Sequence, residues 1–351
     1  MTTGKIITQS DVARKAGVSR GVVSYVINNG PREVAPETRQ RVLAAIQELG
    51  YHPNIHAQNL KRGDLSARRS LGIVAGGHSF NVLERPYYNI ILASLFEEAH
   101  RLGQSVRFFC FFEALTDPVF FHKNIHRDEI SSLVLILPAM ITEKPEYKDI
   151  LDQVAERVDN VVCLEEPIKG WPTIIFDRAL AARQAVEHLI NLGHKSIAFL
   201  AIPDARLAGY RQTLADHGLP CDEDLVFTPD SANILASAYE LTETISKLKP
   251  RPTAIFAAND EIAISAIAAL CDHGIQVPRD MAIVSIDNIG IAAMMRPSLT
   301  TVNVPKREMA AYAMQLLMLH ERMEGQQAAS IVLPTELIIR ESCGAKKIEG
   351  L

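Results

Sequence analysis

The sequence predicts an α/β protein with a small helical head at its N-terminus and a body of two α/β lobes that contain parallel sheets. Two observations predict this fold. Residues 8–50 show short amphipathic helical patterns, whereas from Leu71 onward short apolar, β-rich runs alternate with helical patterns. With 351 residues and 48% hydrophobic content, the chain is long enough to bury more than one core.

The first motif lies in residues 8–28, which read TQSDVARKAGVSRGVVSYVIN. Two helical patterns meet at Gly17, which is the arrangement of a helix-turn-helix. Outward-facing positions on its second helix would meet bases and phosphates, and these are Ser19, Arg20, Gly21 and Tyr25. The residues predicted to pack inward are Val12, Ala13, Ala16, Val18, Val22, Val23, Val26 and Ile27.

The distribution of charge supports binding of nucleic acid by the head. Residues 1–63 contain nine Lys or Arg and four acids, a net charge of +5, while the whole chain carries −5 and the remainder therefore −10. A basic head on an acidic body suits a protein that binds phosphates at one end. The alternative, a helical hairpin at the start of an ordinary enzyme, does not account for this asymmetry.

Residues 34–54 predict a third helix, which begins at Pro36 and ends at Gly50. Proline suits a first helical turn because its missing N–H would have no partner there. Glycine at the end closes the helix, and Pro53 prevents it from resuming. Ala35 stands at the N-cap, where a hydroxyl side chain would be the better cap.

The stretch from Thr8 to Leu60 resembles the lactose-repressor/galactose-repressor (LacI/GalR) family of bacterial transcription regulators. The resemblance implies a helix-turn-helix domain over residues 1–50 and a hinge over residues 51–63, which becomes helical on operator DNA and inserts a leucine into the minor groove. A flexible linker is the alternative for the hinge. The DNA-binding residues implied are Thr8, Ser19, Arg20, Gly21, Ser24, Tyr25, Asn28, His56, Ala57 and Leu60. Gly21 and Tyr25 depart from the family's usual residues, so the operator sequence is not carried over.

The body begins after a polar junction, and its strands and helices alternate. The predicted strands are residues 71–75, 106–112, 132–137, 160–164, 196–201, 254–257 and 281–286, and the predicted helices are 90–102, 180–192, 232–248 and 260–273. Such alternation is typical of parallel sheets covered by helices on both faces. The strands are too numerous for one comfortable sheet, which favours two lobes.

Residues 71–340 resemble the family's periplasmic-binding-protein-like effector domain, through motifs such as Ala258-Asn259-Asp260 and Ser285-Ile286-Asp287-Asn288. The resemblance implies an effector-binding and dimerisation domain over 64–351, with one lobe of 71–168 and 298–328 and another of 169–297 and 329–345. A small molecule, a sugar or sugar derivative, is expected between the lobes. The effector-binding residues implied are Tyr87, Tyr88, Glu165, Arg206, Ser231, Asn259 and Asp287. Taken singly, each of them could also be a helix cap or part of a surface ion pair.

Catalytic and cofactor motifs are missing from the sequence. It has no GxGxxG, GxSxG or GxxxxGK[ST] pattern, and His122 and His126 lack the HExxH context of a zinc site. We therefore expect no enzyme activity, no metal and no cofactor. Two alternatives stay open: a solute-binding protein, which would need a signal peptide, and a sugar-processing enzyme that uses Asp287 with Glu165.

The apolar runs, the cysteines and the two ends of the sequence bear on the cellular location and the oligomeric state of the protein. No apolar run approaches the ~18–20 residues of a membrane span, and the first residues lack a signal-peptide core, so we expect a cytoplasmic protein. The five scattered cysteines suit reduced, buried thiols. Residues 340–351 lack the apolar heptads of a coiled coil, which favours a homodimer on a near-palindromic operator over a tetramer. The expected function is that of a transcription regulator, with repression as the first choice. Activation, or an effector that acts as a co-repressor, is equally compatible with these residues.

Overall fold

The computed structural model describes residues 7–28, 34–51, 70–76, 82–136, 145–168, 170–320 and 330–345. The chain divides into two compact units. Unit 1 comprises Met1–Glu84, Ile91–Ile174 and Met309–Ile331, and unit 2 comprises Arg85–Ile90, Ile175–Glu308 and Val332–Leu351. The chain therefore passes between the two units several times.

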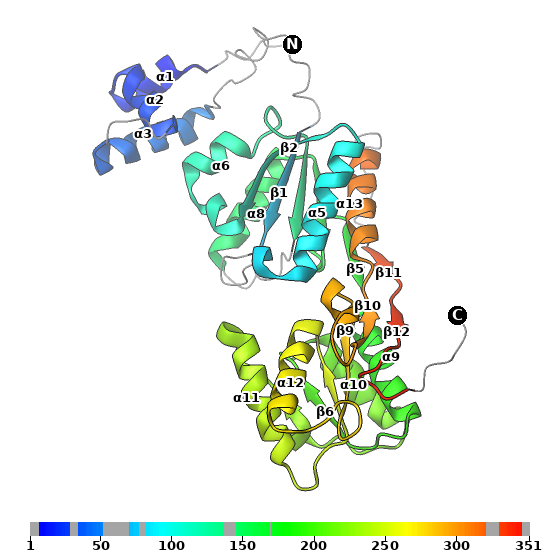
Figure 1. Ribbon diagram of the computed structural model, residues 1–351. Helices are drawn as coiled ribbons and strands as arrows, with labels where there is room; N and C mark the ends of the chain where they lie inside the picture. Colours follow the sequence, from blue (N-terminus) through cyan, green and yellow to red (C-terminus); the bar gives the residue numbers. More distant parts are fainter. Residues whose placement is uncertain are drawn as a thin grey trace. The chain divides into compact units, whose positions relative to one another are not determined.

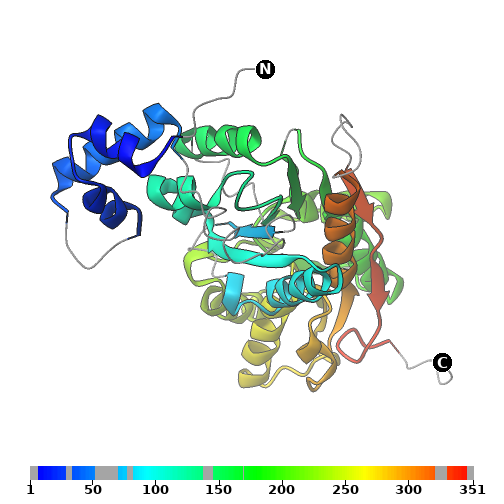
Figure 2. The ribbon, with the colours of Figure 1, turned by 90° about the horizontal axis from the view of Figure 1, so that it is seen from above.

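The head (residues 7–51) is a bundle of three helices, α1 (Gln9–Ala16), α2 (Arg20–Asn28) and α3 (Pro36–Leu49), drawn in blue in Figures 1 and 2. Its core contains Val12, Ala13, Ala16, Val23, Val26, Ile27, Val42, Ala45, Ile46 and Tyr51. Six of the eight residues predicted to pack inward are buried in this core. Val18 is half-buried and packs against it, whereas Val22 is half-buried and outside it. Tyr25, predicted to face outward, is also half-buried.

Unit 1 contains a six-stranded sheet with the strand order β11-β5-β4-β3-β1-β2. Its strands are β1 (Ser70–Ala75), β2 (Ser105–Phe111), β3 (Ser132–Ile136), β4 (Asn160–Leu164), β5 (Thr173–Phe176) and β11 (Ser330–Leu333). The ladders that join β1 to β5 are parallel. Helices α5 (Pro86–Arg101) and α13 (Lys306–His320) lie on one side of the sheet, and α6 (Pro118–Asn124) and α8 (Pro145–Arg157) lie on the other (Figure 1). Two 3-10 turns complete it, η4 (Val82–Glu84) and η5 (Phe112–Thr116).

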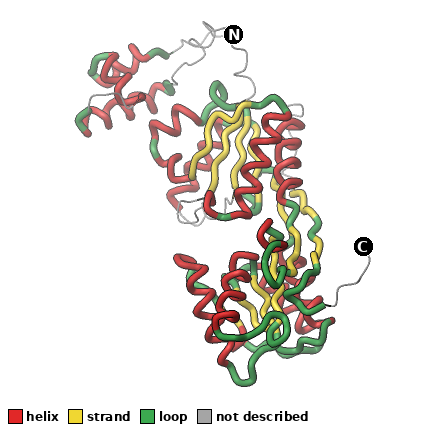
Figure 3. The backbone as a smooth tube through the Cα atoms, in the orientation of Figure 1, coloured by secondary structure: helices red, strands yellow, loops and turns green. Residues whose placement is uncertain are grey.

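Unit 2 contains a second six-stranded sheet with the order β12-β10-β9-β8-β6-β7. Its strands are β6 (Ile197–Leu200), β7 (Val226–Phe227), β8 (Ala254–Ala257), β9 (Ala282–Asp287), β10 (Thr300–Asn303) and β12 (Glu336–Ile338). Only β12 runs antiparallel to its neighbour among these ladders. Helices α9 (Arg178–Asn191) and α10 (Ala205–Asp216) cover one face, and α11 (Ile234–Lys247) and α12 (Asp260–Asp272) the other (Figures 1 and 3). The 3-10 turns are η6 (Glu223–Leu225), η7 (Ser231–Asn233) and η8 (Gly290–Ala293).

Packing in unit 2 is close on both sides of its sheet. The ring of Phe199 lies 5.3 Å from that of Tyr210 and 5.8 Å from that of Phe256 in the core. Helices α9 and α10 approach so closely that a Cβ on Gly209 would lie 2.3 Å from the main-chain oxygen of Ala179. This contact requires glycine, because no side-chain carbon fits at that distance.

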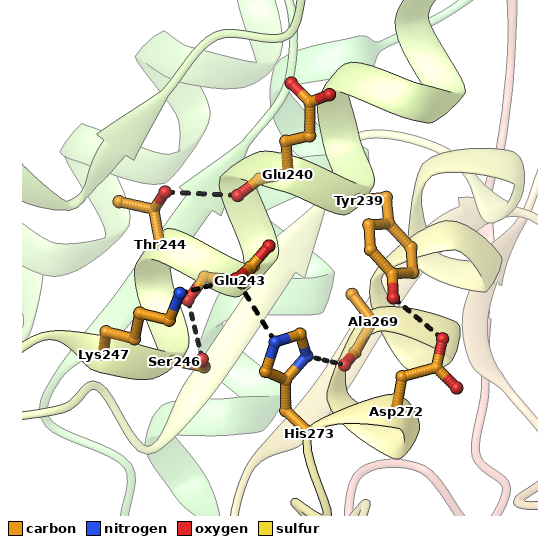
Figure 4. Close-up of polar contacts among 9 residues, drawn as sticks. All are labelled: Tyr239, Glu240, Glu243, Thr244, Ser246, Lys247, Ala269, Asp272 and His273. Atoms are coloured by element: carbon orange, nitrogen blue, oxygen red, sulfur yellow. Dashed lines mark hydrogen bonds and ion pairs between the residues drawn. The ribbon is translucent and has the colours of Figure 1, made fainter.

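On the other face, polar side chains join α11 to α12 (Figure 4). Tyr239 donates a 2.8 Å hydrogen bond from its hydroxyl to Asp272, and Glu243 lies 3.3 Å from the His273 imidazole. Glu243 also pairs with Lys247 one turn further along α11, at 2.5 Å. These contacts are at the solvent-facing side of the helix pair, while Ala238, Thr242 and Ile245 are buried beneath α11.

The predicted α/β class with parallel sheets is confirmed, and each predicted strand run contains or overlaps an observed strand. The sequence reading missed the shorter strands β5, β7, β10, β11 and β12, because runs of two to four residues carry little periodicity. The expectation that all cysteines are buried is wrong, since Cys221 and Cys271 are exposed. Among the described residues, no helix is long and apolar enough to cross a membrane.

Candidate nucleic-acid interface and effector site

The turn between α1 and α2 has the geometry that its sequence predicts. Thr8 caps α1, since its hydroxyl accepts from the main-chain N–H of Asp11 at 3.4 Å while the Asp11 carboxylate accepts from the N–H of Thr8 at 3.0 Å. Gly17 ends α1 in the left-handed region, with φ 66°. Glycine adopts this conformation without steric cost, so the chain turns sharply into α2.

The N-terminal end of α2 carries the exposed polar residues. Ser19 accepts a hydrogen bond from the N–H of Val22 at 3.4 Å, so its hydroxyl caps the helix. Arg20 is exposed, and its Nε donates to Gln9 at 3.4 Å, which holds the guanidinium beside the start of α1. Gly21 is exposed, and a Cβ there would lie 3.7 Å from the Ser19 hydroxyl, an ordinary contact. The fold therefore does not require glycine at position 21.

Two further contacts hold the three helices of the head together. Lys15 pairs with Glu48 at 2.5 Å and so joins α1 to α3. Tyr51 is 5% exposed, and burial raises the pKa of its hydroxyl while a hydrogen bond with Gln9 opposes that shift. Gln9 thus contacts both Arg20 and Tyr51, a connection with no signal in the sequence. As expected, Ala35 provides no side-chain cap for α3.

In unit 2, polar residues gather where the parallel strands end. Residues at the carboxyl ends of β6, β7, β8, β9 and β10, or a few positions after them, belong to the carboxyl edge of this sheet, where ligands bind in open α/β folds. They are Asp204 and Arg206, Ser231, Asn259 and Asp260, Asp287, and Lys306. We call these residues, together with the side chains that the contacts described below connect to them (Arg85, Tyr87, Tyr88, Glu261 and Arg340), the unit 2 edge.

Arg206 is held in place at all three nitrogens of its guanidinium. Nε and Nη2 form a two-pronged ion pair with Asp204, at 3.0 and 2.8 Å, and Nη1 donates to the main-chain oxygen of Ala258 at 2.8 Å. Asp204 also caps α10 by accepting from the N–H of Arg206 at 2.8 Å. The two side chains are 19% and 26% exposed, so the pair is partly shielded from solvent.

Asp260 is the buried polar centre of this edge. Its carboxylate accepts hydrogen bonds from the hydroxyls of Ser285 and Thr301, each at 2.6 Å, and from the N–H of Ile289 at 2.7 Å. Burial raises the pKa of Asp260, while these hydrogen bonds act in the opposite direction. The preceding Asn259 is 8% exposed and caps α12 by accepting from the N–H of Ile262 at 2.8 Å.

The turn after β9 has two successive non-glycine residues at positive φ, Asp287 at 123° and Asn288 at 54°. Such conformations are unfavourable and persist only where surrounding contacts hold them. Lys306 Nζ donates to the main-chain oxygen of Asp287 and, at 2.9 Å, to that of Val304. Arg340 donates to the Asn288 side chain at 2.7 Å. Two cations from later segments therefore fix the conformation of this turn.

The first turn of α5 belongs to unit 2 and contributes an aromatic pair. The rings of Tyr87 and Tyr88 meet edge to face at 5.0 Å, and both residues are at most 7% exposed. Lys306 Nζ lies 5.5 Å from the Tyr87 ring centre. Arg85 lies 5.9 Å from the Tyr88 ring centre and pairs with Glu261 of α12 at 3.0 Å.

Known proteins resemble both the head and the body. Residues 8–54 match the model of "Bacterial regulatory proteins, lacI family", and residues 186–343 match that of a "Periplasmic binding protein-like domain". The regulator DegA of Bacillus subtilis is 32% identical over 95% of this chain and 96% of its own length. The chain belongs to the LacI family. The repressor PurR of Pasteurella multocida is 31% identical over 95% of this chain and 98% of its own length.

Solved structures of LacI-family members share the fold. The regulator CelR in complex with cellobiose is 27% identical, with a TM-score of 0.65 over 96% of this chain and 99% of that one. The lac repressor dimer bound to operator and the anti-inducer ONPF is 26% identical, with a TM-score of 0.66 over 97% of this chain and 100% of that one. The predicted combination of a helix-turn-helix domain and a periplasmic-binding-protein-like body is confirmed.

The structure describes the surroundings of most of the predicted site residues. At the head, Ser19, Arg20 and Gly21 are exposed, Ser24 and Tyr25 are half-buried, and Thr8 serves as a cap. Asn28 ends α2, and its side chain lies outside the described residues, as do His56, Ala57 and Leu60.

Of the predicted effector residues, Tyr87 contacts Tyr88, and Lys306 links the Tyr87 ring to the main-chain oxygen of Asp287. Arg206 donates to the main-chain oxygen of Ala258, which directly precedes Asn259. Ser231 is exposed at the start of η7. Glu165 belongs to unit 1, where it follows β4 with φ 77° and is 6% exposed.

The sequence reading missed Asp204, Asp260, Lys306 and Arg340 as parts of this edge. Asp204 had a usable signal, since an Asp just before a helix is a common cap. Lys306 had none, because only the fold brings the start of α13 to the end of β9.

Proposed function

We propose that this protein is a cytoplasmic transcription repressor whose homodimer binds a near-palindromic operator and is released from it, or tightened on it, by a small-molecule effector. The observation that carries the proposal is the exposed N-terminal end of α2, where Ser19 and Arg20 stand on a helix-turn-helix with an intact cap and turn. The N-terminal residues of such a helix contact base edges in the major groove.

The DNA-binding role is tested at Arg20. A random pool of duplexes, selected with the full-length protein, would supply the operator. Arg20→Ala should then weaken specific binding by roughly 1–3 kcal/mol, because an Arg on this helix can bind guanine with two hydrogen bonds. Arg279→Ala is the matched control, since Arg279 is an exposed arginine of unit 2 whose side chain is 67% exposed. Equal affinity of both variants would refute the assignment of Arg20.

A second test concerns the hinge, residues 51–63. If Leu60 enters the minor groove, Leu60→Ala should reduce bending of the operator, because less of a base step is unstacked. Energy transfer between dyes at the two ends of the duplex would measure the bend. An unchanged bend would leave residues 51–63 as a linker.

The effector is proposed to be a sugar or sugar derivative that binds at the unit 2 edge. The comparison with CelR, which was solved with cellobiose, supports this class of ligand. Such a site would combine the rings of Tyr87 and Tyr88 with the polar groups of Asn259 and Asp287, all of them at most 8% exposed, and aromatic walls with a few polar groups are the usual make-up of a ligand site. Arg206→Ala or Asp287→Ala should abolish the response of operator binding to the effector and leave ligand-free binding largely intact. A normal response in both variants would place the effector elsewhere.

Dimerisation and the lack of enzyme activity belong to the same proposal. One head makes too few phosphate contacts for specific binding at physiological salt, and a two-fold pair about doubles them. The lac repressor was solved as a dimer on its operator, which supports the same assembly here. Light scattering should give a dimer at micromolar concentration, and no sugar of a test panel should be turned over. A stable monomer or tetramer would contradict the proposed assembly.

A further inference from the structure

The cations of the unit 2 edge are all engaged by groups of the protein itself. Arg206 is paired with Asp204, and Arg85 with Glu261 at 3.0 Å. Lys306, only 5% exposed, donates to the main-chain oxygens of Asp287 and Val304. Arg340 donates to the Leu299 oxygen at 2.6 Å and to Asn288. Within the described part of this edge, each of the four cations is therefore already engaged by groups of the protein before a ligand arrives.

The formal charges at this edge also balance. Four carboxylates, Asp204, Asp260, Glu261 and Asp287, stand against the four cations Arg85, Arg206, Lys306 and Arg340. A phosphate or carboxylate ligand would have to lose its hydration shell beside these acids without gaining a free cation. An uncharged ligand with hydroxyl groups meets no such penalty, because hydroxyls donate to carboxylates and accept from amides.

Asp204 has the decisive position in this balance. It holds Nε and Nη2 of Arg206, the two nitrogens with which a guanidinium binds phosphate or carboxylate side-on. An anion that approaches Arg206 from this side must displace Asp204 or tolerate its negative charge a few ångströms away, which is strongly repulsive in a partly shielded site. The cap that Asp204 forms on α10 fixes the carboxylate in this position.

We propose that the effector is an uncharged, hydroxyl-bearing molecule and that Asp204 is the specificity-determining residue that excludes phosphorylated and carboxylated ligands by occupying Arg206. The proposal rests on the proposed function for the location of the effector site. In this proposal, Arg206 is a fixed hydrogen-bond donor of the site, and Asp204 neutralises the charge of Arg206 before any ligand binds.

The test measures binding of inorganic phosphate to the full-length protein by isothermal titration calorimetry. Asp204→Asn keeps a capping side chain on α10, since Asn caps about as well as Asp, but removes the charge. This variant should bind phosphate at least about tenfold more tightly than the parent, because the Arg206 charge is no longer offset. Asp222→Asn is the matched control, as Asp222 caps η6 in unit 2 in the same way. Adding Arg206→Ala to Asp204→Asn should remove the gain.

A second arm compares glucose with glucose 6-phosphate, and cellobiose with its phosphate ester, as effectors of operator binding. If one member of a pair changes the operator affinity of the parent protein, it should be the neutral sugar and not its phosphate. Tighter binding of a phosphorylated member by the parent, or no phosphate gain in Asp204→Asn and in a second cap-preserving variant, Asp204→Ser, would overturn the proposal.

A result that refutes the proposed sugar effector differs from a result that refutes the role of Asp204. If no sugar, neutral or phosphorylated, alters operator affinity, the sugar effector is refuted. The phosphate titration of the Asp204 variants still decides whether Asp204 neutralises Arg206 against anions.

Discussion

Lys306 donates a hydrogen bond from Nζ to the main-chain oxygen of Asp287, although Lys306 begins α13 and Asp287 ends β9. Asp287 has φ 123°, so the lysine stabilises a backbone conformation that an Asp rarely adopts. The same Nζ lies 5.5 Å from the centre of the Tyr87 ring. One buried cation thus positions both an acid and an aromatic ring of the proposed effector site.

Replacing this lysine should affect both stability and effector response. Lys306→Met keeps the approximate length of the side chain but removes the ammonium that donates to the Asp287 and Val304 oxygens, while the Val304 oxygen keeps its bond from the main-chain N–H of residue 306. The loss of these donors should lower the free energy of unfolding by about 1–3 kcal/mol. Urea unfolding would measure the change. Lys247→Met is the control (Figure 4), because Lys247 is 64% exposed and its solvent-screened pair with Glu243 should contribute little to stability. Similar losses in both variants would remove the special role of Lys306.

Gly209 should tolerate no side chain. A Cβ at this position would lie 2.3 Å from the Ala179 oxygen, so Gly209→Ala must push α10 away from α9. We expect a loss of at least about 1–3 kcal/mol of stability, as for other overpacked sites. Gly290→Ala is the comparison, since a Cβ there meets nothing within 4 Å. Thermal unfolding of the two variants should differ clearly, and equal melting temperatures would show that α9 and α10 can separate without cost.

Acid should destabilise unit 2 through two histidines. Burial lowers the pKa of His188, with a further contribution from the charge of His194, and burial lowers the pKa of His194. The unfolded chain therefore binds more protons than the fold just below pH 6.5, the ordinary value for both residues. The corresponding stability is present above that pH and is lost as pH falls through the lowered pKa values of the fold.

Replacing both residues, as His188→Gln with His194→Gln, should flatten the fall in unfolding free energy between about pH 7 and pH 5. Chemical unfolding at a series of pH values would measure the slope. His100→Gln is the control, because His100 is exposed on α5. An unchanged slope in the double variant would assign the acid sensitivity to other groups.

The five cysteines should separate into two groups by reactivity. Cys221 and Cys271 are exposed, whereas Cys110, Cys163 and Cys343 are buried. Burial raises the pKa of both Cys110 and Cys163 to about 12, so almost no thiolate forms at neutral pH. Mass spectrometry after brief treatment of the native protein with iodoacetamide should find the label on Cys221 and Cys271. Equally fast labelling of Cys163 would mean that the sheet of unit 1 opens readily.

Much of the head could be predicted because its structure depends on neighbours in the chain. Gly17 and Gly50 end helices at positive φ, and Pro36 begins one, all through interactions within a few residues. Of the residues predicted to pack inward, Val18 is only partly buried and Val22 lies outside the core, since a three-helix bundle is too small to bury every apolar residue of a short helix. Tyr25 was predicted to face outward but is half-buried, because helical periodicity indicates the face on which a side chain lies and not how deeply it is buried.

Within the body, the sequence by itself determined the class of fold, the strands of the sheet centres and the family, and it named Arg206 and Asp287 through their motifs. It could not reveal that Asp204 neutralises Arg206, or that Lys306 and Arg340 hold the turn after β9. Apolar periodicity and helix caps depend on residues close together in the chain, so they can be recognised in the sequence. The Lys306–Asp287 contact joins residues 19 positions apart, and the Arg340–Asn288 contact joins residues 52 apart. Only the order of strands in the folded sheet brings such residues together, and that order is a property of the tertiary structure.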